Sequence, residues 1–149
     1  MTLPPLFPMN SKTYSLTINA NFTDIDKIIC ALPYIFGQDK EILDDISLVL
    51  FEILSNIIEH SICRYSKDDI FSHSLKNTDQ KIYLYFSSQH HPIILINYPK
   101  TIYSQKNISI GKGKKIIKYL AQSYCHKILE EEVWEKVIFQ RIKNENHHK

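Results

Sequence analysis

The chain has 149 residues, of which 44% are hydrophobic and 23% are charged, and its formal net charge is only +2. This composition predicts one globular domain and argues against a disordered chain. The near-neutral charge speaks against general nucleic-acid binding, and no apolar run is long enough to predict a membrane span.

The first part of the chain predicts an arm, a strand and two helices. Residues 1–11 contain three prolines and no hydrophobic periodicity, so we expect an arm there. Residues 12–19 alternate apolar and polar side chains, which predicts a half-buried strand. A helix should follow, kinked or ended by Pro33 and closed by Gly37. Residues 39–63 are acidic at their start and then apolar nearly all round, which predicts a buried central helix.

The second part of the chain predicts a long polar loop, two strands, one helix and two closing strands. The expected ranges are a loop at 64–80, strands at 81–88 and 92–98, a helix at about 111–124, strands at 125–131 and 136–143 around a turn near 131–135, and a tail at 144–149. This element order predicts an α+β two-layer sandwich, in which three helices cover one face of a mixed, mostly antiparallel sheet. Residues 12–143 would form its single domain.

A polar stripe runs along the expected central helix. Glu52, Asn56 and His60 are four residues apart, which places them on one side of the helix. These residues form either a solvated edge of the helix or the wall of a cleft. Their apolar surroundings favour the second interpretation. In a cleft, Asn56 would offer a neutral oxygen to Mg²⁺, and Glu52 would act as general base toward a hydroxyl or water. Such a pair suits phosphoryl transfer.

The last expected helix opens with the segment IGKGKK at residues 110–115. Lysines at a helix start oppose the macrodipole, and a bound anion would reverse the sign of that effect. Glycines there let backbone N–H groups approach phosphate oxygens. The alternative is an ordinary loop followed by a solvated lysine face. The segment does not match the P-loop pattern.

Together these features resemble the GHKL (Bergerat-type) ATPase domain over roughly residues 12–143. The resemblance is carried by EILSNIIEH at 52–60, the two strands that follow, GKGKKIIKYLAQ at 111–122 and a closing strand. Within that superfamily, the chain looks most like the small anti-sigma-factor serine/threonine kinases of bacterial partner-switching systems.

The resemblance implies ATP and Mg²⁺ as cofactors and assigns roles to individual residues. Glu52 would be the general base, and Asn56 would be the Mg²⁺ ligand. Residues 99–110 would form a lid over the nucleotide. The triphosphate would be bordered by Gly111, Lys112, Gly113 and Lys114.

The segment at residues 97–101 departs from the family pattern. Asn97-Tyr98-Pro99-Lys100-Thr101 stands where relatives usually carry Asp-x-Gly-x-Gly, whose Asp accepts the adenine amino proton. Asn97 would offer its carbonyl oxygen instead, as a weaker neutral acceptor. Two functions are therefore considered: an Mg·ATP-dependent serine/threonine kinase acting on an antagonist protein, and a degenerate GHKL scaffold that binds proteins with weak or no ATP binding.

Partners and compartment follow from the same resemblance and from the cysteines. The expected partner is a sigma factor or an antagonist (anti-anti-sigma) protein, without direct contact to nucleic acid or membrane, and a homodimer is an option. Cys30, Cys63 and Cys125 form no CxxC pair, which predicts free thiols in a reducing cytoplasm.

Overall fold

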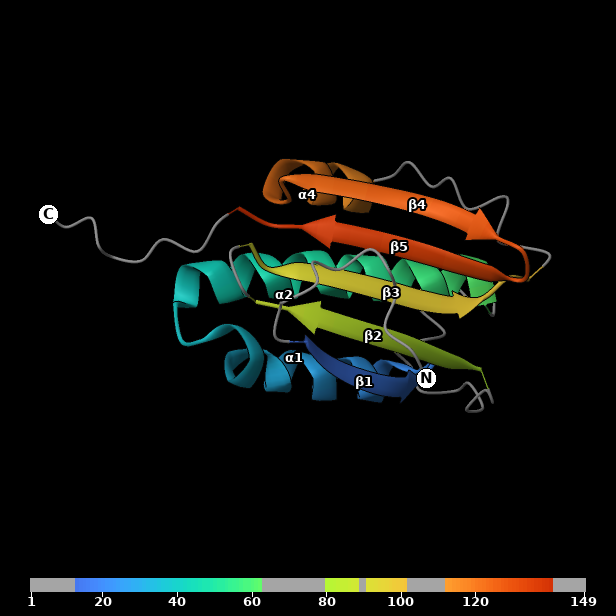
Figure 1. The fold of residues 1–149 in the computed structure, drawn as a ribbon, viewed down its shortest axis with the longest axis horizontal. Coiled ribbons are helices and arrows are strands. Elements are labelled where there is room, and N and C mark those ends of the chain that lie inside the picture. The colour runs from blue at the N-terminus through green and yellow to red at the C-terminus, as the bar shows by residue number, and fades with distance from the viewer. Residues whose placement is uncertain (1–12, 63–79, 89–90, 102–111, 141–149) are drawn as a thin grey trace, which may run out of the picture.

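The computed structural model describes residues 13–62, 80–88, 91–101 and 112–140, so the expected arm (1–11) and tail (144–149) lie outside the described residues. The described part contains five strands, three α-helices and one π-helical segment (Figure 1). In chain order they are β1 (Thr13–Asn19), α1 (Phe22–Phe36), α2 (Lys40–Asn56), the π-helix η1 (Ile57–Ile62), β2 (Lys81–Ser87), β3 (Ile93–Pro99), α4 (Lys112–Leu120), β4 (Ser123–Leu129) and β5 (Glu132–Ile138).

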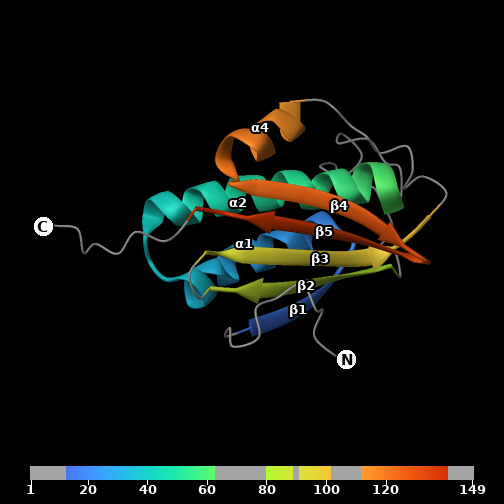
Figure 2. The ribbon, with the colours of Figure 1, turned by 45° about the horizontal axis from the view of Figure 1, so that its top comes forward.

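The five strands form one sheet in the order β1-β2-β3-β5-β4, and every neighbouring pair is antiparallel. The three α-helices all cover the same face of this sheet, which can be followed from two directions in Figures 1 and 2. The predicted α+β architecture with helices on one face is therefore confirmed. The described sheet differs from the prediction in being antiparallel throughout, and not mixed.

The core lies between the helices and the sheet because each strand turns alternate side chains toward the helices. On β2 and β3 these side chains are at most 1% exposed: Ile82, Leu84, Phe86, Ile94, Ile96 and Tyr98. Helix α2 lies in the middle of the helical layer, with α1 and α4 packed against it, as predicted for a buried central helix. None of the described helices is both long enough and apolar enough to cross a membrane.

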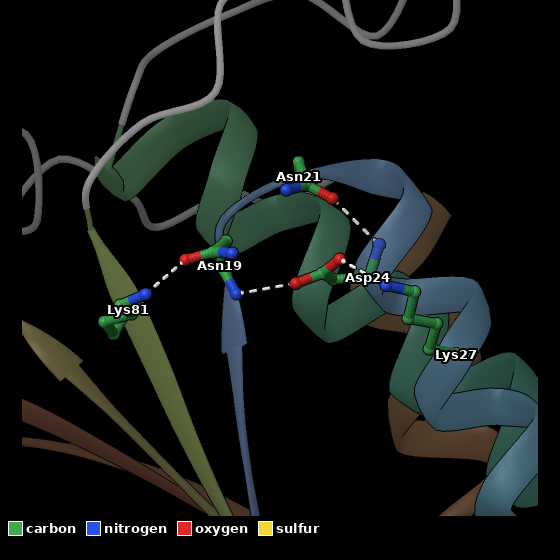
Figure 3. A network of polar contacts seen from close by, with 5 residues as sticks. All are labelled: Asn19, Asn21, Asp24, Lys27 and Lys81. Carbon is green, nitrogen blue, oxygen red and sulfur yellow. Dashed lines mark hydrogen bonds and ion pairs between the residues drawn. The ribbon is translucent and has the colours of Figure 1, made fainter.

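Polar contacts fix the turn between β1 and α1 (Figure 3). The side chain of Asn21 caps the helix by accepting a hydrogen bond from the Asp24 backbone N–H at 2.8 Å. The Asp24 carboxylate accepts from the backbone N–H of Asn19 at 2.9 Å, and Lys27 lies 3.7 Å from the same carboxylate. Lys81 of β2 donates to the Asn19 side chain at 2.6 Å. The start of α1 is therefore tied to the end of β1, which is tied in turn to β2.

Helix α1 continues past Pro33 to Phe36, so the proline lies inside the helix and does not end it. Gly37 closes the helix, as predicted, with a positive φ of 92° that an L-side chain rarely adopts. Its N–H donates to the Pro33 carbonyl at 3.0 Å.

Helix α4 ends earlier than predicted, and both closing strands begin and end earlier than predicted. Helix α4 ends at Leu120, so Tyr124 belongs to β4 and not to the inner face of a helix. The turn between the last two strands contains only Glu130 and Glu131. Because Glu132 already begins β5, Glu135 lies within a strand where a turn was expected.

Candidate functional site

Glu52 and Asn56 lie in the carboxyl-terminal half of α2. Four helical residues rise about 6 Å, so the two side chains leave the helix from successive turns on the same side. Both residues are half-buried, whereas the three residues between them, Ile53, Leu54 and Ser55, are buried. The pair therefore lies at the boundary of the core, where polar groups remain accessible to a ligand.

The helix changes its hydrogen bonding directly after Asn56. At the junction, the Ile57 N–H contacts the carbonyl oxygens of both Ile53 and Leu54, and η1 follows. Segments of π-helix are rare and are frequent at functional sites. Glu59 in η1 is only 8% exposed. A buried carboxylate therefore lies within one turn of Asn56. The backbone of His60, the third residue of the predicted polar stripe, belongs to the same π-helical segment.

The start of α4 lies beside this part of α2. The two helices pack together, and in both views the amino-terminal end of α4 lies along the carboxyl-terminal half of α2 (Figures 1 and 2). The backbone of Lys112, Gly113 and Lys114 forms the first turn of α4. Gly111 and residues 102–110 of the expected lid lie outside the described residues. The predicted triphosphate segment and the carboxyl-terminal half of α2 are thus neighbours.

Asn97, by contrast, is not on the helix side of the sheet. The pairing of β3 with β2 and β5 is continuous, so strand alternation places Asn97 on the face opposite Tyr98, which packs in the core under the helices. Its side chain is 6% exposed, and its Nδ2 donates to the Val133 carbonyl at 3.3 Å. This placement separates Asn97 from α2 and gives no support to the predicted contact with adenine.

A carboxylate that sequence reasoning missed lies on the helix side. Glu135 of β5 is 4% exposed and accepts hydrogen bonds from Tyr98 of β3 and, at 2.5 Å, from Tyr124 of β4. Burial, and next the charge of Glu135, raises the pKa of Tyr124, so its hydroxyl remains a donor. The sequence signal is a period of two: Val133, Glu135 and Val137 are buried and alternate with less buried residues.

A cavity of about 320 Å³ lies at the other end of α2, near its amino terminus. Asp39, Glu41 and Asp45 line it, together with side chains from the end of α4 and from residues just after β5. Burial, followed by the charges of Glu41 and Asp44, raises the pKa of Asp45. In the part of the chain that the structure describes, no three His, Cys, Asp or Glu residues are grouped to hold a metal ion. This cavity does not coincide with the predicted triphosphate site.

A scan against protein-family models gives no match to this chain, and a search of curated proteins gives none either. The likeness to the GHKL domain therefore rests on the residues of the chain and on its α+β architecture.

Proposed function

We propose that this protein is an ATP-binding regulator of the anti-sigma type, with a GHKL-like domain and Mg·ATP-dependent serine/threonine kinase activity. The observation that carries the proposal is the position of Glu52 and Asn56. They are half-buried, one turn apart on the central helix, in the half of α2 that the start of α4 packs beside. An antiparallel sheet with helices on one face is compatible with this function.

In this proposal, the triphosphate lies between Asn56 and the start of α4. Backbone N–H groups at a helix start carry partial positive charge and favour phosphate oxygens. Lys112 and Lys114 add full positive charges in that turn, and Gly113, like Gly111 before it, allows phosphate to approach the backbone closely.

The side chains of Asn56 and Glu52 are oxygen donors, which fits the ligand preference of Mg²⁺. Asn56 would hold the ion, which neutralises charge on the phosphates when bound. Glu52 would accept the proton of a serine or threonine hydroxyl on the antagonist protein. That hydroxyl oxygen would bond to the γ-phosphorus as the bond between phosphorus and the ADP oxygen breaks.

The residues around β3 do not favour tight recognition of adenine. Tyr98 is 1% exposed and fills the helix-side position at the end of the strand, while Asn97 faces the other way. We therefore expect the phosphates and Mg²⁺ to contribute most of the affinity. ATP should bind much more tightly than ADP, and adenosine should not bind measurably.

Calorimetry on the full chain tests the proposal. Wild type should bind Mg·ATP, and Asn56→Ala should weaken that binding by at least about tenfold, the equivalent of 1.4 kcal/mol. Glu52→Gln should retain binding and lose phosphate transfer to the partner. Glu41→Gln, which removes a carboxylate from the first turn of the same helix, should retain both. Absence of heat from wild type at millimolar nucleotide would exclude ATP binding.

A second candidate function is a protein-binding scaffold of the same fold without phosphate transfer. The buried contact between Tyr98 and Glu135 favours it, because that contact occupies the space between β3 and the helices. A scaffold should bind a sigma factor or antagonist equally well with and without Mg·ATP. Its affinity should also be the same in wild type, Asn56→Ala and Glu52→Gln. Phosphorylation of the partner by wild type, lost in Glu52→Gln, would exclude this candidate.

A further inference from the structure

Strand β4 forms one edge of the sheet (Figures 1 and 2), with β5 as its only neighbour among the described strands. An edge strand presents unpaired backbone N–H and C=O groups, to which a further strand can add. Most of β4 is in contact with water, since five of its seven residues are exposed: Ser123, Cys125, His126, Lys127 and Leu129. The outer side of β4 is therefore accessible to a partner.

Hydrogen bonds beside β5 show which residues of β4 direct their backbone groups outward. The N–H of Phe139 donates to the Pro92 carbonyl and the N–H of Lys100 donates to the Glu131 carbonyl, both at 2.9 Å. Because the register of β3 and β5 is continuous, the odd-numbered residues of β5 bond to β3 and the even-numbered ones bond to β4. Their register partners on β4 are odd-numbered. The backbone groups at the open edge consequently belong to Tyr124, His126 and Ile128.

The two ends of β4 are flanked by opposite charges. Lys118 is exposed in the last turn of α4, just before the strand, and Glu130 and Glu131 are exposed in the turn just after it. None of the three forms an ion pair within the part of the chain that the structure describes. Leu120 lines the cavity at the start of α2, and Lys118 is about 200° around α4 from it. Lys118 therefore leaves the helix on the side away from α2.

We propose that two copies of this chain pair antiparallel through β4, about a two-fold axis at His126. His126 is the middle residue of the strand, so this register pairs β4 along its whole length. The three outward residues of each copy then exchange about six backbone hydrogen bonds. The same register places Glu130 of one copy beside Gln122 of the other, one helical turn from Lys118. A two-fold interface repeats each contact, so it gains this ion pair twice.

The side chains that meet across the interface are compatible with this pairing. Tyr124 opposes Ile128, and both are half-buried in the single copy, so their remaining apolar surface is covered. Lys127, the only Lys, Arg, Asp or Glu of the strand, opposes Cys125, so no two such charges directly oppose each other. Because the contact is confined to one strand and its flanks, the dimer should be weak and reversible, with a Kd of about 10–100 μM.

Sedimentation velocity on the full chain tests the proposal. Wild type should change from monomer to dimer between about 1 and 200 μM, the range that spans such a Kd. His126→Pro removes the N–H at the axis but none that bonds to β5, and it should weaken dimerisation at least about tenfold. His126→Ala keeps that N–H and should dimerise like wild type. A monomeric wild type at the highest concentration, or equal dimerisation of His126→Pro, would overturn the proposal.

Charge reversal tests the orientation with variants that leave the strand unchanged. Lys118→Glu and Glu130→Lys should each raise the dimer Kd at least about threefold. The two changes together should restore dimerisation, because the ion pair forms again with its charges exchanged. Losses that simply add in the double variant would exclude the antiparallel contact.

A disulfide at the axis tests the register. In a chain with Cys30, Cys63 and Cys125 replaced by serine, His126→Cys should give a covalent dimer on oxidation, since paired Cα atoms at the axis lie about 5.5 Å apart. Tyr34→Cys, at a position 87% exposed on α1, should give none in the same background. Equal yields from the two variants would contradict the register. Growth of wild type beyond a dimer would indicate pairing of β4 with β1, the other edge, and would also overturn the proposal.

Discussion

Removing the hydroxyl groups of Tyr98 and Tyr124 should destabilise the fold in a coupled way. Each hydroxyl donates to a different oxygen of Glu135, which is 4% exposed. A hydrogen bond to a charged group contributes about 1.5–3 kcal/mol to stability. We therefore expect Tyr98→Phe to lower the free energy of unfolding by that amount, and Tyr124→Phe by an amount near the lower limit because Tyr124 is less buried.

The double variant should lose more stability than the sum of the two single variants. After the first hydroxyl is removed, the second carries more of the stabilisation of the same buried carboxylate, so the coupling free energy should reach about 0.5 kcal/mol or more. Replacing Glu135 with Leu in the double variant should recover much of the loss, since the buried carboxylate that the two hydroxyls bonded is then replaced by an apolar group.

Urea unfolding followed by Trp134 fluorescence measures the free energy of unfolding of wild type, the two single variants, the double variant and the triple variant. Tyr34→Phe, at a position that is 87% exposed, is the matched control and should leave stability unchanged. Two results together would refute this account: single losses that add within about 0.3 kcal/mol, and a triple variant less stable than the double. They would mean that the two hydroxyls do not jointly stabilise the buried carboxylate of Glu135.

Three further outcomes are expected. Folding raises the pKa of Tyr124 above its ordinary value of 10.0, so the unfolded chain loses this proton first as the pH rises. The free energy of unfolding should be insensitive to this group below pH about 10 and should fall above it by up to about 1.4 kcal/mol per pH unit. A fall in wild type that is as shallow as the fall in Tyr124→Phe would contradict this. Glu130 has a φ of 57°, a backbone conformation that glycine adopts without strain, so Glu130→Gly should raise the free energy of unfolding by about 0.5–1 kcal/mol. Glu131→Gly should lower it. If thermal denaturation shows the reverse order of stability, the turn is not strained at Glu130. Asp39 accepts from the N–H groups of Glu41 and Ile42 at 3.1 and 3.4 Å, so Asp39→Ala should cost about 1 kcal/mol; an effect no larger than that of Gln38→Ala would show that the cap contributes nothing.

Hydrophobic periodicity was sufficient to predict most elements because burial dominates their formation. The central helix and strands β2 and β3 consist largely of residues that the core requires, so their patterns are visible locally. The closing strands were shifted because Glu135 occupies an inward position that an apolar residue normally fills. Its hydrogen-bond partners lie 11 and 37 positions away, and no local pattern contains that information.

The candidate site was predictable only in part. The spacing of Glu52 and Asn56 follows from helical geometry alone. The position of α4 beside α2 depends on tertiary packing, which no motif encodes. The face on which Asn97 lies was available from the sequence, since counting by two from Ile94 and Ile96 leads to Tyr98 and not to Asn97. The π-helical turn after Asn56 has no compositional signature.

The order of the strands divides the sheet into two units that meet along a single seam. Strands β1, β2 and β3 are neighbours in chain order, whereas β4 and β5 form a hairpin that joins them only where β5 pairs with β3. Contacts across this seam are distant in the chain; Tyr98 and Glu135 are 37 positions apart. Closing so large a loop costs entropy before the contacts form, so the seam should assemble late in folding. A backbone cut between β3 and α4 would yield two complementary fragments, and their reassociation would measure the combined strength of the seam and of the packing of α4 against α2.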